Sequence, residues 1–119
     1  MVTFKLIEKK HKFYLSNGFY RLYLGGVFSV NNIDLVDIGL TAMKTQDYVT
    51  LKELNFKTKQ YINGIKAIAC YEFEVMNAGD FEIEFDNIEN LELKSSSLFL
   101  SNFLFPSKID ISDIQVIIQ

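Results

Sequence analysis

The sequence predicts a single all-β domain, built as an antiparallel β-sandwich with a jelly-roll-like strand arrangement. Three observations lead to this fold class. Short stretches of alternating apolar and polar residues recur along the chain. Turn signals separate them every 8 to 12 residues or so, as in sandwiches and barrels. No strand–helix alternation of the kind that builds parallel sheets is present. A flattened β-barrel is the alternative, with at most one short helix near residues 50–60.

The composition fits one domain that spans residues 1–119. Hydrophobic residues make up 49% of the chain and aromatic residues 14%, which favours strands and excludes general disorder. A chain of this length can close a core without a disulfide or a metal. Pro106 is the only proline, so no proline-rich linker divides the chain.

The N-terminal residues predict one strand and a tight hairpin. Residues 2–7 alternate as a strand, and residues 8–12 form a polar turn. Residues 13–16 and 19–24 then flank Asn17-Gly18, the dipeptide that best suits a two-residue type I′ turn. The core face of this hairpin is expected to carry Phe13, Leu15, Tyr20, Leu22 and Leu24. The opposite face carries Lys12, Tyr14, Phe19, Arg21 and Tyr23.

The middle of the chain gives weaker signals. Gly25-Gly26 ends the preceding strand, residues 27–30 predict a short one, and Asn31-Asn32 predicts a turn. Residues 33–40 alternate imperfectly as a further strand. Residues 41–61 fit neither the helical nor the strand period, so a single short helix or a long loop is expected there.

Residues 65–86 form the clearest predicted hairpin. A strand over 65–76 follows Asn63-Gly64, turns at residues 77–79 and returns over 81–86. Alternation places Tyr71, Phe73, Val75, Phe81, Ile83 and Phe85 on one buried side. The other side carries Glu72, Glu74, Glu82, Glu84 and Asp86.

In this hairpin, Glu74 would face Glu82 and Glu72 would face Glu84. Because like charges directly opposite one another are unfavourable, a cation is expected beside the acidic side. The candidates within the chain are Lys5, Lys57, Lys59 and Lys66. A basic protein partner that docks on the acidic side is the alternative source of positive charge.

The C-terminal residues predict short strands around one strongly apolar run. Residues 91–94 alternate and three serines follow. Residues 98–105 are then almost wholly apolar, which suits a segment covered on both sides. Pro106 ends this run, and residues 109–118 predict one or two closing strands.

The net charge of −3 hides a division between two halves of the chain. Residues 1–66 carry a balance of +5, whereas residues 67–119 carry a balance of −8. Such asymmetry marks either an interaction surface or two halves that pair inside one fold. Pairing within the fold is the favoured interpretation.

Catalytic signals are scarce. His11 is the only histidine and is expected as a solvated turn residue, whereas Cys70 lies in an apolar run and is expected as a buried core residue. One histidine and one cysteine cannot build a Cys/His zinc site within the chain. The acidic residues lie on regular strands, which do not suit a calcium-binding loop. The chain has no tryptophan, one of the aromatic residues that bind sugar rings at glycosidase sites. We expect no enzyme activity, no cofactor and no metal.

The aromatic and basic face of the first hairpin is the main candidate interaction surface. Its members Tyr14, Phe19, Arg21 and Tyr23 combine stacking surface with positive charge, which suits sugars or single-stranded nucleic acid. The isoelectric point of about 5.1 opposes nucleic-acid binding. This face and residues 98–105 together offer more apolar surface than a small sandwich covers, which indicates an interface.

The functional hypothesis is therefore a non-catalytic module that binds protein and self-associates into a homo-oligomer. The alternative is a module that binds carbohydrate or another small ligand through the aromatic face. No stretch approaches the roughly 18 apolar residues of a membrane helix, so no membrane partner is expected. A lone cysteine and the absence of a signal-peptide pattern at the first residues favour the cytoplasm.

Overall fold

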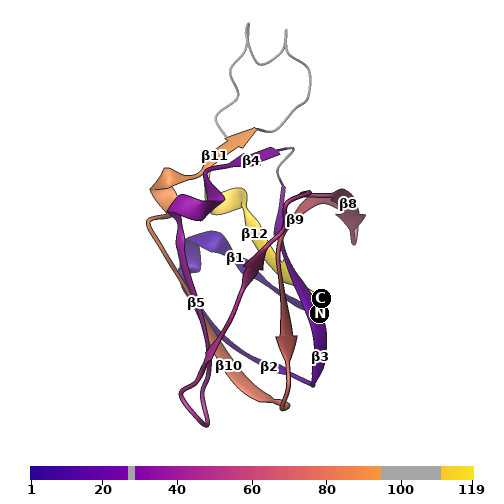
Figure 1. Cartoon of the computed structure of the whole chain (residues 1–119). Coiled ribbons are helices and arrows are strands. Elements are labelled where there is room, and N and C mark those ends of the chain that lie inside the picture. The colour runs from indigo at the N-terminus through magenta and orange to yellow at the C-terminus, as the bar shows by residue number, and fades with distance from the viewer. Residues whose placement is uncertain (27–28, 95–110) are drawn as a thin grey trace, which may run out of the picture.

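The computed structural model describes residues 1–26, 29–94 and 111–119 (Figure 1). Its strands form two packed antiparallel sheets and a small third one, consistent with the predicted β-sandwich. The helical segments of the described residues are three-residue 3-10 turns: η1 (Leu6–Glu8), η2 (Ile33–Leu35), η3 (Ile88–Asn90) and η4 (Ile111–Asp113). None of the helices in these ranges could cross a membrane. The fold class predicted from the alternation of apolar residues is confirmed.

Sheet A has six strands, in the order β1-β12-β3-β9-β7, with β8 also paired to β9. They are β1 (Val2–Lys5), β12 (Gln115–Ile118), β3 (Gly18–Gly25), β9 (Ile65–Val75), β7 (Lys52–Glu53) and β8 (Lys59–Ile62). Sheet B has four strands in the order β2-β10-β5-β6. They are β2 (Lys10–Leu15), β10 (Gly79–Asp86), β5 (Asp37–Ala42) and β6 (Tyr48–Val49). A separate pair joins β4 (Ser29–Asn31) to β11 (Glu92–Lys94).

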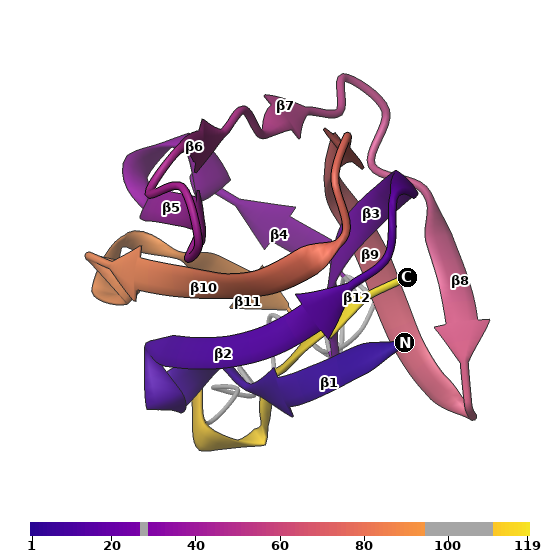
Figure 2. The same ribbon diagram turned by 90° about the horizontal axis from the view of Figure 1, so that it is seen from below.

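The two sheets are connected along both of their long sides (Figure 2). On one side, residues 48–53 pass from sheet B to sheet A, since β6 pairs with β5 and β7 pairs with β9. On the other side, the chain passes from β1 through η1 to β2. These connections give the sandwich some of the character of a flattened barrel, with the N- and C-terminal strands side by side.

The inner faces of the two sheets form one core. All six residues assigned to the buried side of the predicted acidic hairpin belong to it: Tyr71, Phe73, Val75, Phe81, Ile83 and Phe85. Leu22 and Leu24 of β3 and Leu15 of β2 are also buried, while Phe13 and Tyr20 pack against them partly buried. The predictions of these inward-facing residues are confirmed.

A β-bulge in β9 gives sheet A a second, smaller core on its outer face. Leu22 pairs with Tyr71 and Tyr23 pairs with Ala69, so Cys70 is the extra residue. On the outer side, Tyr23 and Ala69 are buried together with Ile62 of β8, with Leu54 packed against them. The curled β8–β9 arm therefore covers part of this outer face (Figure 1).

Both predicted hairpins are wrong, because each turn carries the chain from one sheet to the other. β2 and β3 flank Asn17-Gly18, yet β2 pairs with β10, and β3 pairs with β9 and β12. β9 and β10 flank residues 77–79 and also belong to different sheets. A type I′ turn needs positive φ at both central residues, and Asn17 is not among the described residues with positive φ. These two turns are corners of the sandwich.

A tight Asn-Gly hairpin does form, at the other such dipeptide. Asn63 (φ 49°) and Gly64 (φ 78°) join β8 to β9, with Ile62 paired to Ile65. Positive φ at both positions is the backbone of a type I′ turn. In the weakly predicted stretch 41–61, the structure has β6, β7 and the start of β8 and no helix.

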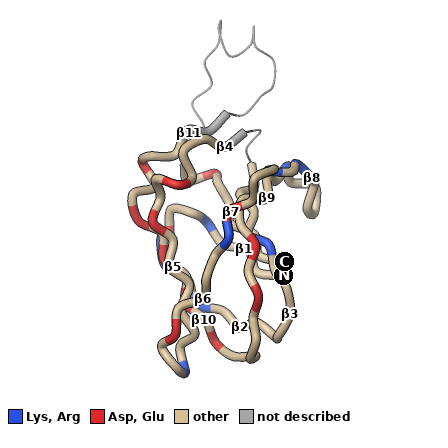
Figure 3. The backbone as a smooth tube through the Cα atoms, in the orientation of Figure 1, with Lys and Arg blue, Asp and Glu red and all other residues tan. Residues whose placement is uncertain are grey.

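The acidic strands meet lysines instead of each other. The predicted pairing of Glu74 with Glu82 and of Glu72 with Glu84 is wrong, because these residues lie in different sheets. Glu82 lies between two lysines of β2, with N–O distances of 3.8 Å to Lys10 and 3.9 Å to Lys12. The expected cation is present, and the basic N-terminal half does pair with the acidic C-terminal half (Figure 3).

The acidic side forms ion pairs with lysines outside the predicted four. Besides Lys10 and Lys12, Lys52 of β7 lies 3.7 Å from the Glu72 carboxylate. Of the four predicted lysines, Lys57 bonds to Glu53 at 3.1 Å. Lys10 and Lys12 belong to β2, whereas the polar residues 8–12 predict a turn there.

His11 was expected in a solvated turn, and this expectation is wrong. It lies in β2, partly buried, with its ring stacked on Phe4 at a centroid distance of 4.5 Å. Its Nδ1 atom lies 3.5 Å from the Glu8 carboxylate. The strand alternation that begins at Lys10 turns His11 toward the aromatic side of β2, so the ring serves packing.

Candidate functional site

A groove lies at the end of the sandwich where the corners are. Three segments surround it: the end of β2, the stretch 42–50 that contains the β5–β6 turn, and the β9–β10 corner. We call it the end groove. Its volume is about 1280 Å³.

The end groove has an apolar floor and a mixed rim. Phe13, Val75 and Phe81, all packed in the core, line it from the inside. On the rim, three large side chains are mainly exposed: Tyr48 (84%), Met76 (72%) and Tyr14 (62%). Charged rim residues of both signs are Lys12, Lys44, Asp47, Glu74 and Asp80. An apolar concave surface with a few polar groups is the usual character of a binding site.

The pairing between β7 and β9 ends beside the end groove. β7 and β9 pair only at Lys52↔Glu72 and Glu53↔Tyr71. An uninterrupted antiparallel ladder would continue with Thr50 opposite Glu74 and Tyr48 opposite Met76. Instead, β6 pairs with β5, and residues 48–50 and 74–76 both contribute to the lining of the groove.

A second hollow of about 650 Å³ adjoins the end groove on the outer face of sheet A. The two share Thr50 and Glu74 in their linings, so they form a continuous surface. We call the second one the Phe19 hollow. The Phe19 ring is 82% exposed there, beside Arg21. The Phe19 hollow and the end groove together are the end surface.

The structure separates the predicted aromatic face. Tyr14 lies in sheet B at the end groove, opposite Asp80 instead of Arg21. Phe19 and Arg21 lie together in sheet A, at the Phe19 hollow. Tyr23 shares their face but is buried under the β8–β9 arm, so its prediction as an exposed contact residue is wrong.

The predicted acidic face is divided too. Its five members lie on the outward sides of β9 and β10, and those strands belong to opposite sheets: Glu72 and Glu74 in sheet A, Glu82, Glu84 and Asp86 in sheet B. The two inner faces pack on each other, so the two groups of acids lie on opposite outer faces of the sandwich.

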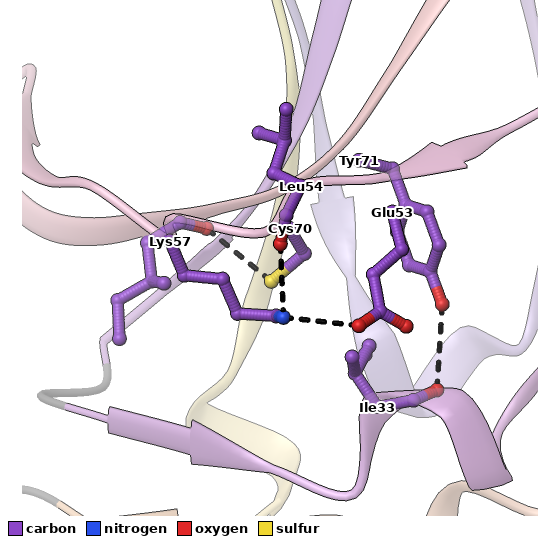
Figure 4. Close-up of polar contacts among 7 residues, drawn as sticks. Ile33, Glu53, Leu54, Lys57, Cys70 and Tyr71 are labelled. Atoms are coloured by element: carbon purple, nitrogen blue, oxygen red, sulfur yellow. Dashed lines mark hydrogen bonds and ion pairs between the residues drawn. The ribbon is translucent and has the colours of Figure 1, made fainter.

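One cluster of titratable side chains lies elsewhere, beside β7 and β9 (Figure 4). Burial raises the pKa of the Cys70 thiol to about 12, although nearby Lys57 opposes the shift. Burial, with a smaller contribution from Glu53, also raises the pKa of Tyr71 to about 12. The Tyr71 hydroxyl donates a hydrogen bond to the carbonyl of Ile33 at 3.4 Å. A protonated, inaccessible thiol is a poor nucleophile, so this cluster serves packing.

The sequence pattern does not indicate two rim residues of the end surface, Tyr48 and Met76. Tyr48 lies in the stretch without clear periodicity, and Met76 was assigned to the end of a hairpin strand. Their exposure follows from the corner and the diverging strands, which no local pattern marks. Within the described ranges, no group of three or more His, Cys, Asp or Glu residues is placed to hold a metal ion.

Comparison of the chain with protein-family models, with curated proteins and with solved structures found no match.

Proposed function

We propose that this chain is a non-catalytic β-sandwich that acts by protein contact and associates with itself through the end surface. The observation that carries the proposal is the grouping of exposed apolar side chains there. Phe19, Tyr48 and Met76 are each more than 70% exposed around two continuous hollows. Contiguous exposed apolar surface of this kind marks interaction sites, whereas single exposed residues do not.

The side chains that would serve catalysis support a role without chemistry. The Cys70 thiol is buried, with its pKa raised to about 12. The His11 ring packs against Phe4 and Phe13, at centroid distances of 4.5 and 6.2 Å. Neither side chain lies in the lining of the end surface.

The test is light scattering after size exclusion at high micromolar concentration. The wild-type chain is expected to elute as a dimer or larger species. Phe19→Asp and Tyr48→Asp are each expected to weaken association by more than about tenfold, because interface aromatic residues carry much of the binding energy. Phe56→Asp is the matched control, because Phe56 is 86% exposed but does not line the end surface.

A monomeric wild-type chain would remove self-association from the proposal. Equal weakening by the Phe56 variant would place the contact outside the end surface. In either case the end surface would need another partner.

A second candidate function is the binding of a carbohydrate in the end groove. It rests on Tyr14 and Tyr48, two exposed rings at the same groove, with Asp47, Asp80 and Lys12 as hydrogen-bonding groups. Titration calorimetry with a panel of oligosaccharides tests it. Binding that Tyr48→Ala abolishes supports this function, and no heat with any oligosaccharide argues against it.

A further inference from the structure

The outer face of sheet B has a hollow centred on a glycine. β5 packs on the core through alternate residues, Ile38, Leu40 and Ala42. Alternation therefore turns Gly39 outward, with Glu84 opposite it on β10. A hollow of about 630 Å³ and a smaller one of about 280 Å³ meet at this point, because Gly39, Glu84 and Tyr48 line both. We call the two together the Gly39 hollow.

The Gly39 hollow combines an open floor, an aromatic ring and negative charge. A Cβ on Gly39 would meet nothing within 4 Å, so a side chain from outside can enter there. Tyr48, which is 84% exposed, lines the hollow beside this floor. No lysine or arginine of the described residues lines it, whereas four acidic residues do: Asp37, Glu82, Glu84 and Asp86. Carboxylates next to an exposed ring suit a cationic side chain.

The neighbouring lysines leave part of this negative charge without an ion pair. Lys10 and Lys12 both form their ion pairs with Glu82. Glu84 lies opposite Lys10 in the ladder but forms no ion pair with the described residues. The planar guanidinium of arginine can bond a carboxylate through two N–H groups and can also stack on an aromatic ring, whereas the lysine ammonium is a compact point charge. The hollow therefore favours arginine.

The chain has a single arginine, Arg21, and its side chain is exposed on the other sheet. It lies on the outward side of β3 with Phe19, in the Phe19 hollow. Its cross-strand neighbour Glu72 forms an ion pair with Lys52 at 3.7 Å. The Arg21 guanidinium itself forms no ion pair with the described residues. It is therefore available for a carboxylate of another molecule.

Arg21 cannot reach the Gly39 hollow of its own chain. β3 belongs to sheet A and β5 to sheet B, and the core lies between them. Packed sheets are about 10 Å apart, and both surfaces face away from that space. A second copy has no such restriction. In a contact between two copies, the exposed Phe19 beside Arg21 would also meet the surface that carries Tyr48.

We propose that Arg21 of one copy inserts into the Gly39 hollow of a second copy, between the Tyr48 ring and the Glu84 carboxylate. This inference rests on the proposed self-association and names its contact. The arginine and the hollow lie on opposite outer faces of the sandwich, so the contact is heterologous. Repetition gives a ring if the rotation closes and a filament if it does not.

The test combines a variant defective in the arginine with one defective in the hollow. Arg21→Gln removes the guanidinium, and Gly39→Val fills the floor with a residue that suits a strand. Each variant alone is expected to associate at least about tenfold more weakly in light scattering, because arginines are frequent hot spots of interfaces. An equal mixture is expected to form a two-chain species, because the hollow of the first variant accepts Arg21 of the second.

Two controls exclude a general effect of charge or of misfolding. Lys5→Gln also removes one positive charge from an exposed residue of sheet A, but Lys5 lines neither hollow. This variant is expected to assemble like the wild-type chain. Circular dichroism checks that each variant is folded, and Glu84→Gln replaces Gly39→Val if the latter is not.

The outcomes separate this inference from the proposed function. If folded Arg21→Gln and Gly39→Val variants assemble like the wild-type chain while Phe19→Asp does not, the end surface stands and the arginine contact is wrong. A mixture of folded variants that stays monomeric, or equal weakening by Lys5→Gln, also overturns the contact. A monomeric wild-type chain overturns both.

Discussion

Replacement of Phe73 by Ala tests whether the core formed by the two sheets carries the stability of the fold. Phe73 lies in β9, is 5% exposed and stacks on Tyr20 of β3 at a centroid distance of 5.6 Å. Burial of the ring contributes about 1.5 to 3 kcal/mol. The stacked pair adds roughly 0.5 to 1.5 kcal/mol, and the cavity left by the ring adds a further cost, so the expected loss is about 3 to 5 kcal/mol.

The assay is equilibrium unfolding in urea, at a concentration where all variants are monomeric. Phe19→Ala is the matched control, since Phe19 lies in β3 of the same sheet but points outward and is 82% exposed. Its expected change in the free energy of unfolding lies within about 0.5 kcal/mol. A loss below about 1 kcal/mol for Phe73→Ala, or equal losses for the two variants, would refute the assignment of Phe73 to the core.

Two other predictions concern the β8–β9 turn and the buried thiol and phenol groups of Cys70 and Tyr71 in β9. Gly64→Ala is expected to lower the free energy of unfolding by about 1 kcal/mol or more in urea titrations, because φ is 78° at Gly64. Gly39→Ala in β5 is the control and should not destabilise, because its Cβ meets nothing within 4 Å. For Cys70 and Tyr71, the folded pKa is about 12 against ordinary values of 9.0 and 10.0, so the unfolded chain loses these protons first. Their contribution to stability should be complete below pH 9 and fall as the pH rises toward 12. Cys70→Ala should flatten the start of that fall in pH-dependent unfolding, and an identical pH profile would contradict the role of the thiol.

The alternation of apolar residues was sufficient to predict what is buried, but not which strands pair. Phe81, Ile83 and Phe85 face the core as predicted, because the side-chain period of two holds for any strand with one buried face. A strand that pairs with its chain neighbour and one that crosses to a second sheet have the same period. The Asn-Gly rule could not decide between them either, since it holds at Asn63-Gly64 and fails at Asn17-Gly18.

The end surface could not be predicted because it arises from three segments distant in sequence. Tyr48, Met76 and Tyr14 meet there through the β5–β6 turn and the corners. The groove lining between β6 and β9 depends on the ladder ending at Lys52↔Glu72, because β6 belongs to sheet B and pairs with β5. No local pattern at residues 48–50 marks that change of partner.

The arrangement of charged residues in the sequence did indicate the correct strand pairing. The predicted acidic hairpin would have placed Glu74 against Glu82 and Glu72 against Glu84, at a cost of several tenths of a kcal/mol for each like-charged pair. A nearby cation is expected because it would offset that cost. The same cost also argues against the hairpin itself.

Pairing β10 with β2 removes the conflict without any additional partner. Lys10 and Lys12 recur at the same period of two as Glu82 and Glu84, and the ladder sets Lys12 opposite Glu82 and Lys10 opposite Glu84. Antiparallel strands with rows of opposite charge on the outer face are stabilised by the cross-strand pairs that like-charged rows would oppose. The division of charge between the two halves of the chain is therefore a signal of strand pairing, and it favours the sandwich corner at residues 77–79 over a hairpin there.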